Sequence, residues 1–469
     1  LMKLRTLLAA STAMALAAPA ALAQTTEIVT STADSGAGSF RAALAAVAGT
    51  GGRIVVAAEG GIAIDSPLEY TGTAPLHVVG NGQTVSAAGN HDLFASVNGG
   101  DLTITDLTFA GPGGFDIESR GDTDGAAGKG IFVDVAEDRT GLVALVLEDV
   151  TVSGVANHGI HVSDCDLADA CGGGGGGAGG GSEAGIVLQL VNVTVDDAGN
   201  GKFDADGLRV DERGPGTIAA SISGSTFRNV GADGIELDEG QAGDVRVVMS
   251  GTVFEDNGAY CPPDLLAAFM PDPAEGEFAP GAATMDDIPR APTGTPDDSC
   301  FEFEAETHDD GSVAEFEIGI DVDDAFDVDE AGPGAIHAVV KDTEILDSFD
   351  EGLDYDEEGP GDIDMVLIGM SASGNADDGY KHSEADAGSV RAVVVDSAAT
   401  DNGGVGFVFE EEDGGDVTVS MMRTSTSGND GGELGVEAVQ EDDGTGVLQL
   451  TDGDIADGVE AEGVTRSDM

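Results

Sequence analysis

The sequence has very little positive charge. Its 469 residues include 18 Lys and Arg against 89 Asp and Glu, and the formal net charge is −71 at pH 7. Nucleic acids and anionic membrane surfaces attract proteins through clustered Lys and Arg, so this composition argues against both as partners. Trp is absent and aromatic residues make up 4% of the chain, yet 41% of the residues are hydrophobic. That apolar fraction is enough for a folded core built mainly of aliphatic side chains.

Long apolar stretches are also missing, except at the start of the chain. Lys3 and Arg5 precede an apolar run over residues 7–22, and Ala21-Leu22-Ala23 has the small-residue pattern of a signal cleavage site. We therefore expect residues 1–23 to be a signal peptide and the protein to be secreted, periplasmic or held at the cell surface. No later stretch is apolar for long enough to span a bilayer, so we expect no membrane span.

Cysteine is scarce, with four residues in the chain. In an exported protein an even number of cysteines indicates disulfides. Local pairing, Cys165 with Cys171 and Cys261 with Cys300, is the simplest of the three connectivities, and each pair would close a loop with little core of its own. A cysteine metal site is disfavoured because no C-x-x-C spacing occurs.

A repeat of about 27 residues dominates what the sequence does contain. A short strand pattern, glycine-apolar-any-apolar-polar, returns as Gly207-Leu-Arg-Val-Asp211, Gly234-Ile-Glu-Leu-Asp238 and Gly352-Leu-Asp-Tyr-Asp356. The steps from 207 to 234, from 325 to 352, from 352 to 379 and from 379 to 406 are all 27 residues. A second, alternating strand follows in the same register, as in Gly243-Asp-Val-Arg-Val-Val-Met249. Alternation of this kind is typical of a strand with one buried face.

The repeat predicts an all-β solenoid. One unit cannot bury its apolar face alone, whereas units stacked about 4.8 Å apart bury a continuous core and pair equivalent strands in parallel. Propeller blades need about 40–50 residues, so a propeller is excluded. We predict about 11 or 12 coils in one domain over residues 24–469, with insertions at 112–129, 171–182 and 259–310. Residues 319–323 also fit the strand pattern, so the register after the last insertion stays open.

The insertions have two interpretations. On a solenoid, insertions often gather on the binding face. They can equally be disordered decorations, and the Gly-rich composition of residues 171–182 favours flexibility there.

The chain resembles the right-handed parallel β-helix proteins of the pectate-lyase-like superfamily. Residues 34–41, Asp-Ser-Gly-Ala-Gly-Ser-Phe-Arg, look like the "DSGxGSLRxAI" opening of many secreted bacterial β-helix proteins, with Phe in place of the usual Leu. The resemblance covers most of the chain and implies a right-handed parallel β-helix. Ser39 can N-cap a helix in which Phe40, Leu44 and Val47 share one face, and such a helix would plug the open end of the solenoid.

The repeat also predicts a column of carboxylates. Side chains alternate along a strand, so the residues two and four places after the glycine point away from the core. Like charges about 5 Å apart repel by roughly 3 kcal/mol at an effective dielectric of 20. Bound Ca²⁺, which prefers oxygen ligands, would offset this repulsion. We therefore hypothesise a Ca²⁺-binding acidic face made of Asp206, Asp211, Asp233, Asp238, Asp329, Asp354 and Asp356. The turn after each strand adds further acids to this face, among them Glu212, Glu239, Glu330 and Glu357.

A bland alternative explains the same acids. They can form a solvated surface adapted to salty water, where Na⁺ screening suffices. The calcium-repeat signature G-G-x-G-x-D does not occur in the sequence. Saturable Ca²⁺ binding in high NaCl would separate the two interpretations.

Catalysis on a glycan is a further alternative. Paired carboxylates serve glycoside hydrolysis, and Asp204 and Asp206 precede Asp233 by one coil, as acids do in polygalacturonase-like β-helices. The Gly-His-Gly and Arg-x-Lys motifs of that family are missing. A polysaccharide lyase would instead need a Ca²⁺-bound uronate and a basic proton abstractor.

Three basic residues are candidates for that proton abstractor. They are Lys381, His382 and Arg391. The register predicts Lys381 beside Asp354 one coil below, which is equally a plain salt bridge. Lyase motifs of the W-x-D-H or R-x-P-x-x-R kind are not present.

Two histidines lie close together on one coil. His158 and His161 precede Cys165, but no third metal ligand is evident, so we expect surface histidines in a turn.

Together these features predict an exported, monomeric, non-catalytic β-helix protein that binds Ca²⁺ and a polysaccharide or other cell-surface component. The alternatives are a polysaccharide lyase or glycoside hydrolase, and an adhesin or structural spacer. A groove lined by aromatic residues beside one basic residue would favour an enzyme. A flat acidic sheet would favour the other two.

Overall fold

The computed structural model describes residues 25–115, 128–167, 171, 179–259, 261, 267–290, 300–301, 303–308, 311–320, 322–441 and 444–469. The expected signal peptide at 1–23 lies outside these residues, as do parts of the three expected insertions. Within the described residues no helix is both long and apolar enough to cross a membrane.

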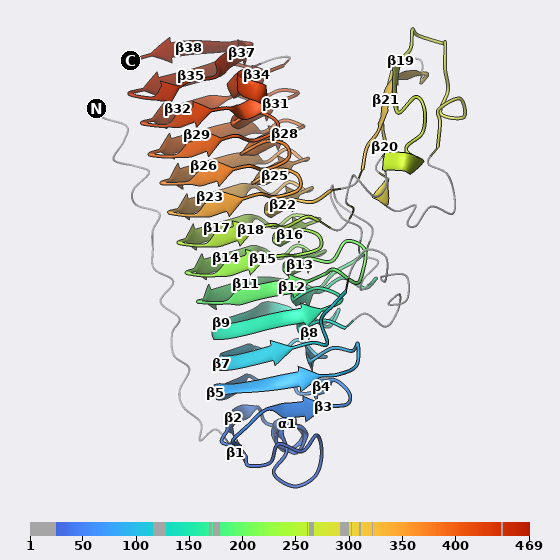
Figure 1. Ribbon diagram of the computed structural model, residues 1–469, viewed down its shortest axis with the longest axis vertical. Helices are drawn as coiled ribbons and strands as arrows, with labels where there is room; N and C mark the ends of the chain where they lie inside the picture. Colours follow the sequence, from blue (N-terminus) through green and yellow to red (C-terminus); the bar gives the residue numbers. More distant parts are fainter. Residues whose placement is uncertain are drawn as a thin grey trace.

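The chain winds into a parallel β-helix, as the repeat predicts. Its coils stack from the N-terminal strands to the C-terminal ones, and two long sheets of 23 and 12 strands run the length of the described stack (Figure 1). The 12-stranded sheet receives one strand from each coil. Its strands are β4 (Leu68–Tyr70), β6 (Phe94–Ser96), β8 (Ile131–Asp134), β10 (Ile160–Ser163), β13 (Leu208–Glu212), β16 (Ile235–Glu239), β22 (Phe326–Glu330), β25 (Asp354–Glu357), β28 (Lys381–Glu384), β31 (Phe407–Glu411), β34 (Leu434–Gln440) and β37 (Gly458–Glu462).

The 23-stranded sheet receives one or two strands from each coil. They are β1 (Thr26–Val29), β2 (Gly52–Val56), β3 (Ile62–Ile64), β5 (Leu76–Ala87), β7 (Leu102–Ala110), β9 (Thr140–Val155), β11 (Glu183–Val191), β12 (Thr194–Ala198), β14 (Ile218–Ser223), β15 (Thr226–Arg228), β17 (Val245–Ser250), β18 (Val253–Glu255), β23 (Ile336–Lys341), β24 (Glu344–Leu346), β26 (Asp362–Ile368), β27 (Ser371–Ser373), β29 (Ser389–Val395), β30 (Ala398–Thr400), β32 (Thr418–Met422), β33 (Ser425–Ser427), β35 (Gly446–Thr451), β36 (Asp454–Ile455) and β38 (Val464–Asp468). Two short 3-10 helices, η4 (Ala267–Phe269) and η6 (Asn429–Gly432), lie outside the sheets.

The helix expected after Ser39 is present as α1 (Phe40–Val47). The Ser39 hydroxyl accepts a hydrogen bond from the Ala42 N–H at 3.2 Å, which satisfies a free donor of the first turn. Phe40, Leu44 and Val47 are buried on one face and belong to the same apolar cluster as the strands. The helix therefore extends the core at the N-terminal end of the stack (Figure 1).

Equivalent core residues lie on top of one another inside the solenoid. The Phe227 and Phe254 rings are stacked with centroids 5.5 Å apart, and Phe254 stacks on Phe326 at 6.1 Å. A column of asparagines lies farther along the stack: Asn375 Nδ2 donates to Asn402 Oδ1 at 3.1 Å, and Asn402 Nδ2 donates to Asn429 Oδ1 at 2.8 Å. The asparagines also accept backbone N–H groups, so this buried polar column is hydrogen-bonded from coil to coil.

The longest insertion contains a small sheet of its own. β19 (Glu275–Glu277), β20 (Phe303–Thr307) and β21 (Val313–Ile318) pair antiparallel and stand beside the stack (Figure 1). Ile288, Val313 and Phe316 form a separate apolar cluster there. The sheet ends at Ile318, beyond the expected boundary at 310, and β22 then pairs with β16 in unbroken register. The described part of this insertion is therefore not a disordered decoration.

Both disulfides follow the local connectivity. Cys165 bonds to Cys171 and Cys261 bonds to Cys300, with Cα–Cα separations of 6.1 and 5.6 Å.

The asparagine column generates a stability prediction. Asn402→Ala removes the acceptor for the Asn375 side chain and leaves buried N–H groups unpaired, which costs about 1–3 kcal/mol. Asn98→Ala is the matched control, because Asn98 is half-buried and gives one hydrogen bond, to the Thr71 carbonyl. It should cost less than about 1 kcal/mol. Urea unfolding measures the free energy of unfolding of both variants. Equal losses would contradict the stabilising role of the asparagine column.

Candidate functional site

A stripe of acids runs across the face of the 12-stranded sheet that points away from the core. Asp211 pairs with Asp238, Asp238 with Asp329, and Asp329 with Asp356, so the expected stacking of these acids is confirmed. A neighbouring row precedes the strands. We define the acidic stripe as Asp206, Asp211, Asp233, Glu236, Asp238, Asp324, Asp327, Asp329, Glu351, Asp354 and Asp356.

The stripe is not the solvated surface that the salt-adaptation interpretation assumed. Asp211 and Asp238 are fully buried, and Asp329 is 8% exposed. Two buried arginines lie among the acids of the first half, and the Cys165–Cys171 disulfide contacts one of them. Burial makes every unneutralised charge here costly, because the acids have lost water as a partner.

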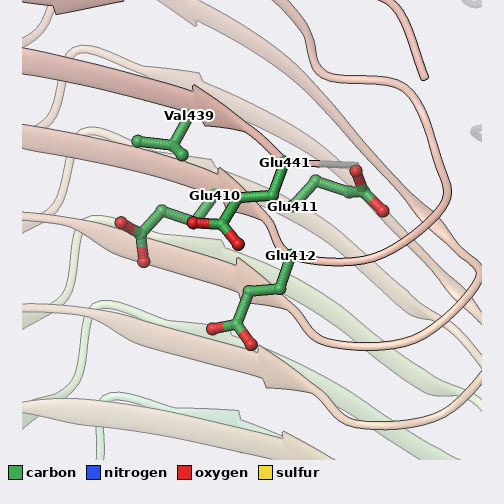
Figure 2. Close-up of a pocket in the computed structure, with 5 residues that line it drawn as sticks. All are labelled: Glu410, Glu411, Glu412, Val439 and Glu441. Carbon is green, nitrogen blue, oxygen red and sulfur yellow. The ribbon is translucent and has the colours of Figure 1, made fainter. Parts of the chain in front are cut away.

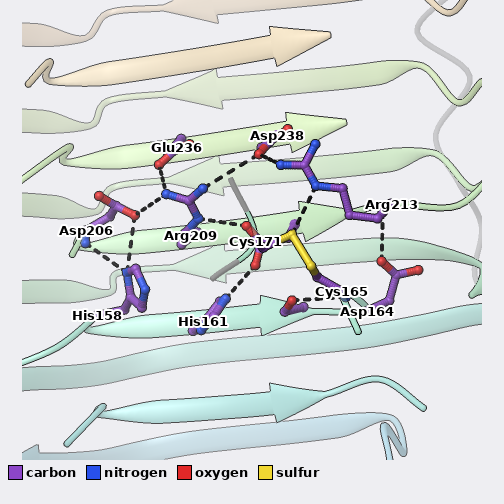
Figure 3. Close-up of polar contacts among 12 residues, drawn as sticks. His158, His161, Asp164, Cys165, Cys171, Asp206, Arg209, Arg213, Glu236 and Asp238 are labelled. Atoms are coloured by element: carbon purple, nitrogen blue, oxygen red, sulfur yellow. Dashed lines mark hydrogen bonds and ion pairs between the residues drawn. A yellow bond between two sulfur atoms is a disulfide. The ribbon is translucent and has the colours of Figure 1, made fainter. Parts of the chain in front are cut away.

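Arg209 neutralises the first half of the stripe. Its Nη1 contacts Glu236 and lies 3.1 Å from Asp204 Oδ1, and its Nε donates to Asp211 Oδ1 at 2.7 Å (Figure 3). Asp206 Oδ2 is 3.5 Å from the same Nη1. The Arg209 side chain on β13 therefore forms ion pairs with at least four carboxylates from two coils.

Arg213 continues the network toward the disulfide. Its Nη2 contacts Asp238 Oδ2 and its Nε donates to Cys171 Sγ at 3.1 Å (Figure 3). The side chain is fully buried. The Cys165–Cys171 disulfide thus lies against the Arg213 end of this network.

His158 and His161 belong to this network, so the expectation of surface histidines is wrong. Both are buried, and burial lowers the pKa of His161 to about 4. The neutral ring of His161 donates from Nε2 to Asp211 Oδ2 at 2.7 Å and accepts from Lys129 Nζ at Nδ1, also at 2.7 Å. His158 Nδ1 accepts the Asp206 backbone N–H at 2.9 Å. The sequence did contain a signal for these contacts. His158 and His161 stand one coil before Asp206 and Asp211, at a spacing that brings them together when the coils stack.

These contacts decide which acids keep free oxygens. Asp211 is engaged at both oxygens, and Arg209 and His161 hold its pKa below the usual range in spite of burial. Asp206 is also engaged, since its Oδ1 accepts the Asp233 N–H at 3.2 Å and burial raises its pKa to about 7. Both oxygens of Asp211 therefore already have a donor, and the metal-ligand role that we predicted for it stays a prediction.

The second half of the stripe has far less positive charge. Ligand oxygens of Asp324, Glu351 and Asp354 lie within 4.8 Å of one another, and each residue is at most 9% exposed. Lys381 Nζ donates to Asp354 Oδ2 at 2.8 Å and lies 3.5 Å from Glu351 Oε1. The predicted salt bridge between Lys381 and Asp354 is thus confirmed. Among the described residues, no aromatic ring contacts Lys381.

Several oxygens in the second half have no hydrogen-bond partner. They are Oδ1 of Asp324, Oδ1 of Asp354 and Oδ1 of Asp356. Burial and neighbouring carboxylates raise the pKa of Asp354 to about 6 and those of Asp324 and Asp356 well above the usual range. Asp329, whose pKa rises to about 7, adjoins them. These groups need either protons or a cation.

Other predicted site residues lie elsewhere. His382 points into the core, where its ring stacks on Phe409 at 5.1 Å and Nδ1 contacts the Val408 carbonyl, so it cannot reach a ligand on the stripe. Its place at the third position after the glycine explains this, because that position faces inward. Arg391 lies on β29 of the other sheet and contacts Asp364 Oδ1 at 3.4 Å.

The turn acids also face inward. Glu212, Glu239, Glu330 and Glu357 follow the outward residue of each strand by one place, so they return to the core side, where all four are fully buried. They are not part of the acidic face, which corrects our prediction. Sequence reasoning missed Glu236 and Asp327 as members of the stripe, and it placed Asp324 and Glu351 in the row before the strands without choosing them as metal ligands.

A shallow hollow of about 200 Å³ lies farther along the stack. Figure 2 shows its lining, which consists of Glu410, Glu411, Glu412, Val439 and Glu441. The lining contains no aromatic and no basic residue, so it lacks the groups expected of a glycan-cleaving groove.

Comparison with known proteins gives no family. No protein-family model matches the chain, and no curated protein matches it in sequence. Among solved structures, the catalytic unit of an α-1,3-glucanase from Streptomyces thermodiastaticus is 13% identical, with a TM-score of 0.44 over 96% of this chain and 70% of that one. A pectate lyase is 12% identical, with a TM-score of 0.35 over 87% and 80%.

A surface adhesin of Streptococcus pneumoniae is 10% identical, with a TM-score of 0.30 over 94% of this chain and 93% of that one. Enzymes and an adhesin thus occur side by side among these structures. The function proposed below rests on this chain's own residues.

Arg209 generates the prediction for this site. Arg209→Gln leaves several buried carboxylates without their cation and should destabilise the fold by about 3–5 kcal/mol at pH 8. The loss should shrink at pH 5, where protonation can neutralise the acids. Arg391→Gln is the control, because its side chain is 45% exposed and its ion pairs are worth less than about 1 kcal/mol. Urea unfolding at constant ionic strength measures both variants, and similar losses would contradict the assigned role.

Proposed function

We propose that this is an exported, non-catalytic β-helix protein whose acidic stripe binds Ca²⁺ at Asp324, Glu351 and Asp354. The observation that carries the proposal is the pair of unpartnered buried oxygens, Oδ1 of Asp324 and Oδ1 of Asp354, in a group whose ligand atoms lie within 4.8 Å. Export is supported by the two disulfides, which persist in oxidising compartments.

The distribution of cations favours the second half of the stripe. In the first half, Arg209 and Arg213 share the acids. In the second half, Lys381 is the cation that contacts the described acids, and it pairs with Asp354 and Glu351. Excess negative charge therefore remains where the free oxygens are, and a divalent ion would offset it.

The donor set fits Ca²⁺ better than other metals. All three side chains offer carboxylate oxygens, and Ca²⁺ takes 6–8 oxygen ligands in a flexible geometry. Waters would complete the shell, since three carboxylates supply at most six oxygens. Sites without imidazole or thiolate donors disfavour zinc and copper.

Binding should compete with protons. In the absence of a cation, the raised pKa values favour a proton on Asp324 and, below about pH 6, also on Asp354. A metal ion requires the deprotonated ligands, so Ca²⁺ binding releases protons and affinity rises with pH through about 6.

The calcium prediction uses two ligand variants. Asp324→Asn and Asp354→Asn should each weaken Ca²⁺ binding at least about tenfold in titration calorimetry at pH 7.5 in high NaCl. Asp362→Asn is matched in charge but lies on the other sheet with a side chain 41% exposed, and it should leave the affinity within about twofold. Wild-type affinity should increase from pH 5 to pH 7.5. Equal weakening by all three variants, or no saturable binding, would refute the site.

The proposal of carbohydrate binding depends on the proposed Ca²⁺ site. The negative field of the chain repels anionic polysaccharides, and stripe-bound Ca²⁺ could bridge to their carboxylates. We therefore propose an anionic glycan or cell-surface component as the partner of the Ca²⁺-loaded protein.

Glycoside hydrolysis is a second candidate because of one observation. Oxygens of Asp204, Asp206 and Glu236 lie within 4.8 Å, and burial raises the pKa of Asp206 to about 7, as a general acid requires. Arg209 and the burial of Asp206 oppose this role, because they leave little room for a sugar.

A glycan panel distinguishes the two candidates. For a non-catalytic protein we expect neither new reducing ends nor unsaturated products, with or without Ca²⁺. Turnover that Asp206→Asn abolishes, but that Asp362→Asn leaves intact, would replace the binding function with hydrolysis.

A further inference from the structure

A second carboxyl column, separate from the acidic stripe, lies inside the solenoid. The residue after each outward stripe acid stacks on its equivalent: Glu212 pairs with Glu239, Glu239 with Glu330, and Glu330 with Glu357. We define the interior ladder as Asp164, Glu212, Glu239, Glu330, Glu357, Glu384, Glu411 and Gln440. All but Gln440 are at most 1% exposed, and Gln440 is 6% exposed.

Each glutamate of the ladder caps the turn that follows it. Glu330 Oε1 accepts the Gly332 and Gly334 N–H groups at 3.1 and 3.3 Å. Glycine is required at the second of these positions, since a Cβ on Gly334 would lie 1.6 Å from the Gly243 carbonyl oxygen and 2.6 Å from Glu330 Oε1. The turns thus fix the carboxyls in place.

The hydrogen bonds alternate from coil to coil. In Glu212, Glu330 and Glu384, both backbone N–H groups go to Oε1, and Oε2 receives no N–H donor. In Glu239 and Glu357, each oxygen accepts one backbone N–H. Asp164 at the start of the ladder also accepts N–H groups at both oxygens, from Arg213 and Ser182.

Gln440 shows what the alternating positions need. Its Oε1 accepts the Val417 N–H at 3.0 Å, and its Nε2 donates to Glu411 Oε2. Its Nε2 also donates to the Glu441 carbonyl at 2.9 Å, so at this position of the ladder a donor, and not a second acceptor, faces the neighbouring carboxyl. A glutamine is the isostere of a protonated glutamic acid, which likewise offers one acceptor and one donor.

From this alternation we propose that the interior ladder binds protons at fixed positions, with Oε2 of Glu212, Glu330 and Glu384 carrying a proton at neutral pH and donating it to the next carboxyl. Neighbouring carboxyls of the ladder interact from coil to coil, Glu239 with Glu212 and Glu330, and Glu357 with Glu330 and Glu384. Two facing carboxylate oxygens without a proton would repel in a medium from which water is excluded.

The surroundings offer no other source of positive charge for the middle of the ladder. The titratable groups that face Glu330 are Glu239 on β16 and Glu357 on β25, and its described hydrogen bonds and ion pairs include no Lys, Arg or His. Burial and these neighbours raise the pKa values of Glu239 and Glu357 to about 10. A proton shared by two carboxyls belongs to the pair, and the oxygen without an N–H donor is the one free to carry it.

The proposed protons make the stability of the fold decrease as the pH rises. Unfolded glutamates lose their protons near pH 4.3, so the folded ladder binds more protons than the unfolded chain above that pH. The folding equilibrium constant then falls as the pH rises, by up to tenfold per pH unit for each retained proton. The ladder makes the solenoid a proton-stabilised structure.

Two substitutions at adjacent coils test the assignment. Glu330→Gln supplies the N–H that the proton would supply, so its urea midpoint at pH 7 should equal or exceed that of the wild type. Between pH 7 and pH 9, the folding equilibrium constant of Glu330→Gln should fall less steeply with pH than that of the wild type, by up to a factor of ten per pH unit. Glu357→Gln places an amide N–H against backbone donors and should lower the midpoint. The pH series uses EDTA and constant NaCl, so divalent cations on the acidic stripe do not contribute and the Na⁺ contribution is constant.

A spectroscopic readout covers the case in which Glu357→Gln fails to fold. The infrared carbonyl band of protonated carboxylic acids should be present in the wild type at pH 7 and weaker in Glu330→Gln. The proposal is overturned if this band is absent from the wild type or unchanged in Glu330→Gln. It is also overturned if Glu357→Gln is the better tolerated substitution. A loss of Na⁺- or Ca²⁺-dependent stability in Glu330→Gln would show that the ladder holds a metal ion instead of protons.

Discussion

Parallel pairing in register is the constraint on which the rest of this structure depends. It places like residues on like residues, whether their contact is favourable or costly. Phe227 on Phe254 and Asn402 on Asn429 gain from this rule. Asp238 on Asp329 suffers from it, because the same register stacks carboxylates at the spacing of neighbouring strands. The polar contacts of the molecule reduce this repulsion between stacked carboxylates.

The chain meets this cost differently along its length. In the first half of the acidic stripe, Arg209 and Arg213 supply fixed positive charge, and the buried histidines complete the hydrogen bonds. In the second half, Asp324 and Asp354 retain unpartnered oxygens. Inside the coil, backbone N–H groups hold the carboxyls of the interior ladder. Arginine is the observed neutralising group in the first half, whereas the calcium ion of the second half and the protons of the ladder are our proposals.

Much of the fold could be predicted from the sequence, because the 27-residue step is arithmetic. It places Asp211 next to Asp238 and Lys381 next to Asp354, and both contacts are present. Burial could not be predicted in the same way, since it depends on Arg209 contacting acids of two coils and on Cys171 contacting Arg213. The inward direction of Glu212 and His382 could have been predicted from strand alternation, had it been counted one residue further into the turn. The ligand of the candidate site is not encoded by any motif, so chemistry alone had to suggest it.

The pairing of β16 with β22 has a consequence for how such chains can change. The longest insertion lies between these strands, with its own small sheet and a disulfide, yet the coils close above and below it in unbroken register. Continuity of the stack therefore does not require continuity of the chain. A corner of this kind is a natural junction where new segments can be acquired, exchanged or grafted by design while the scaffold is preserved.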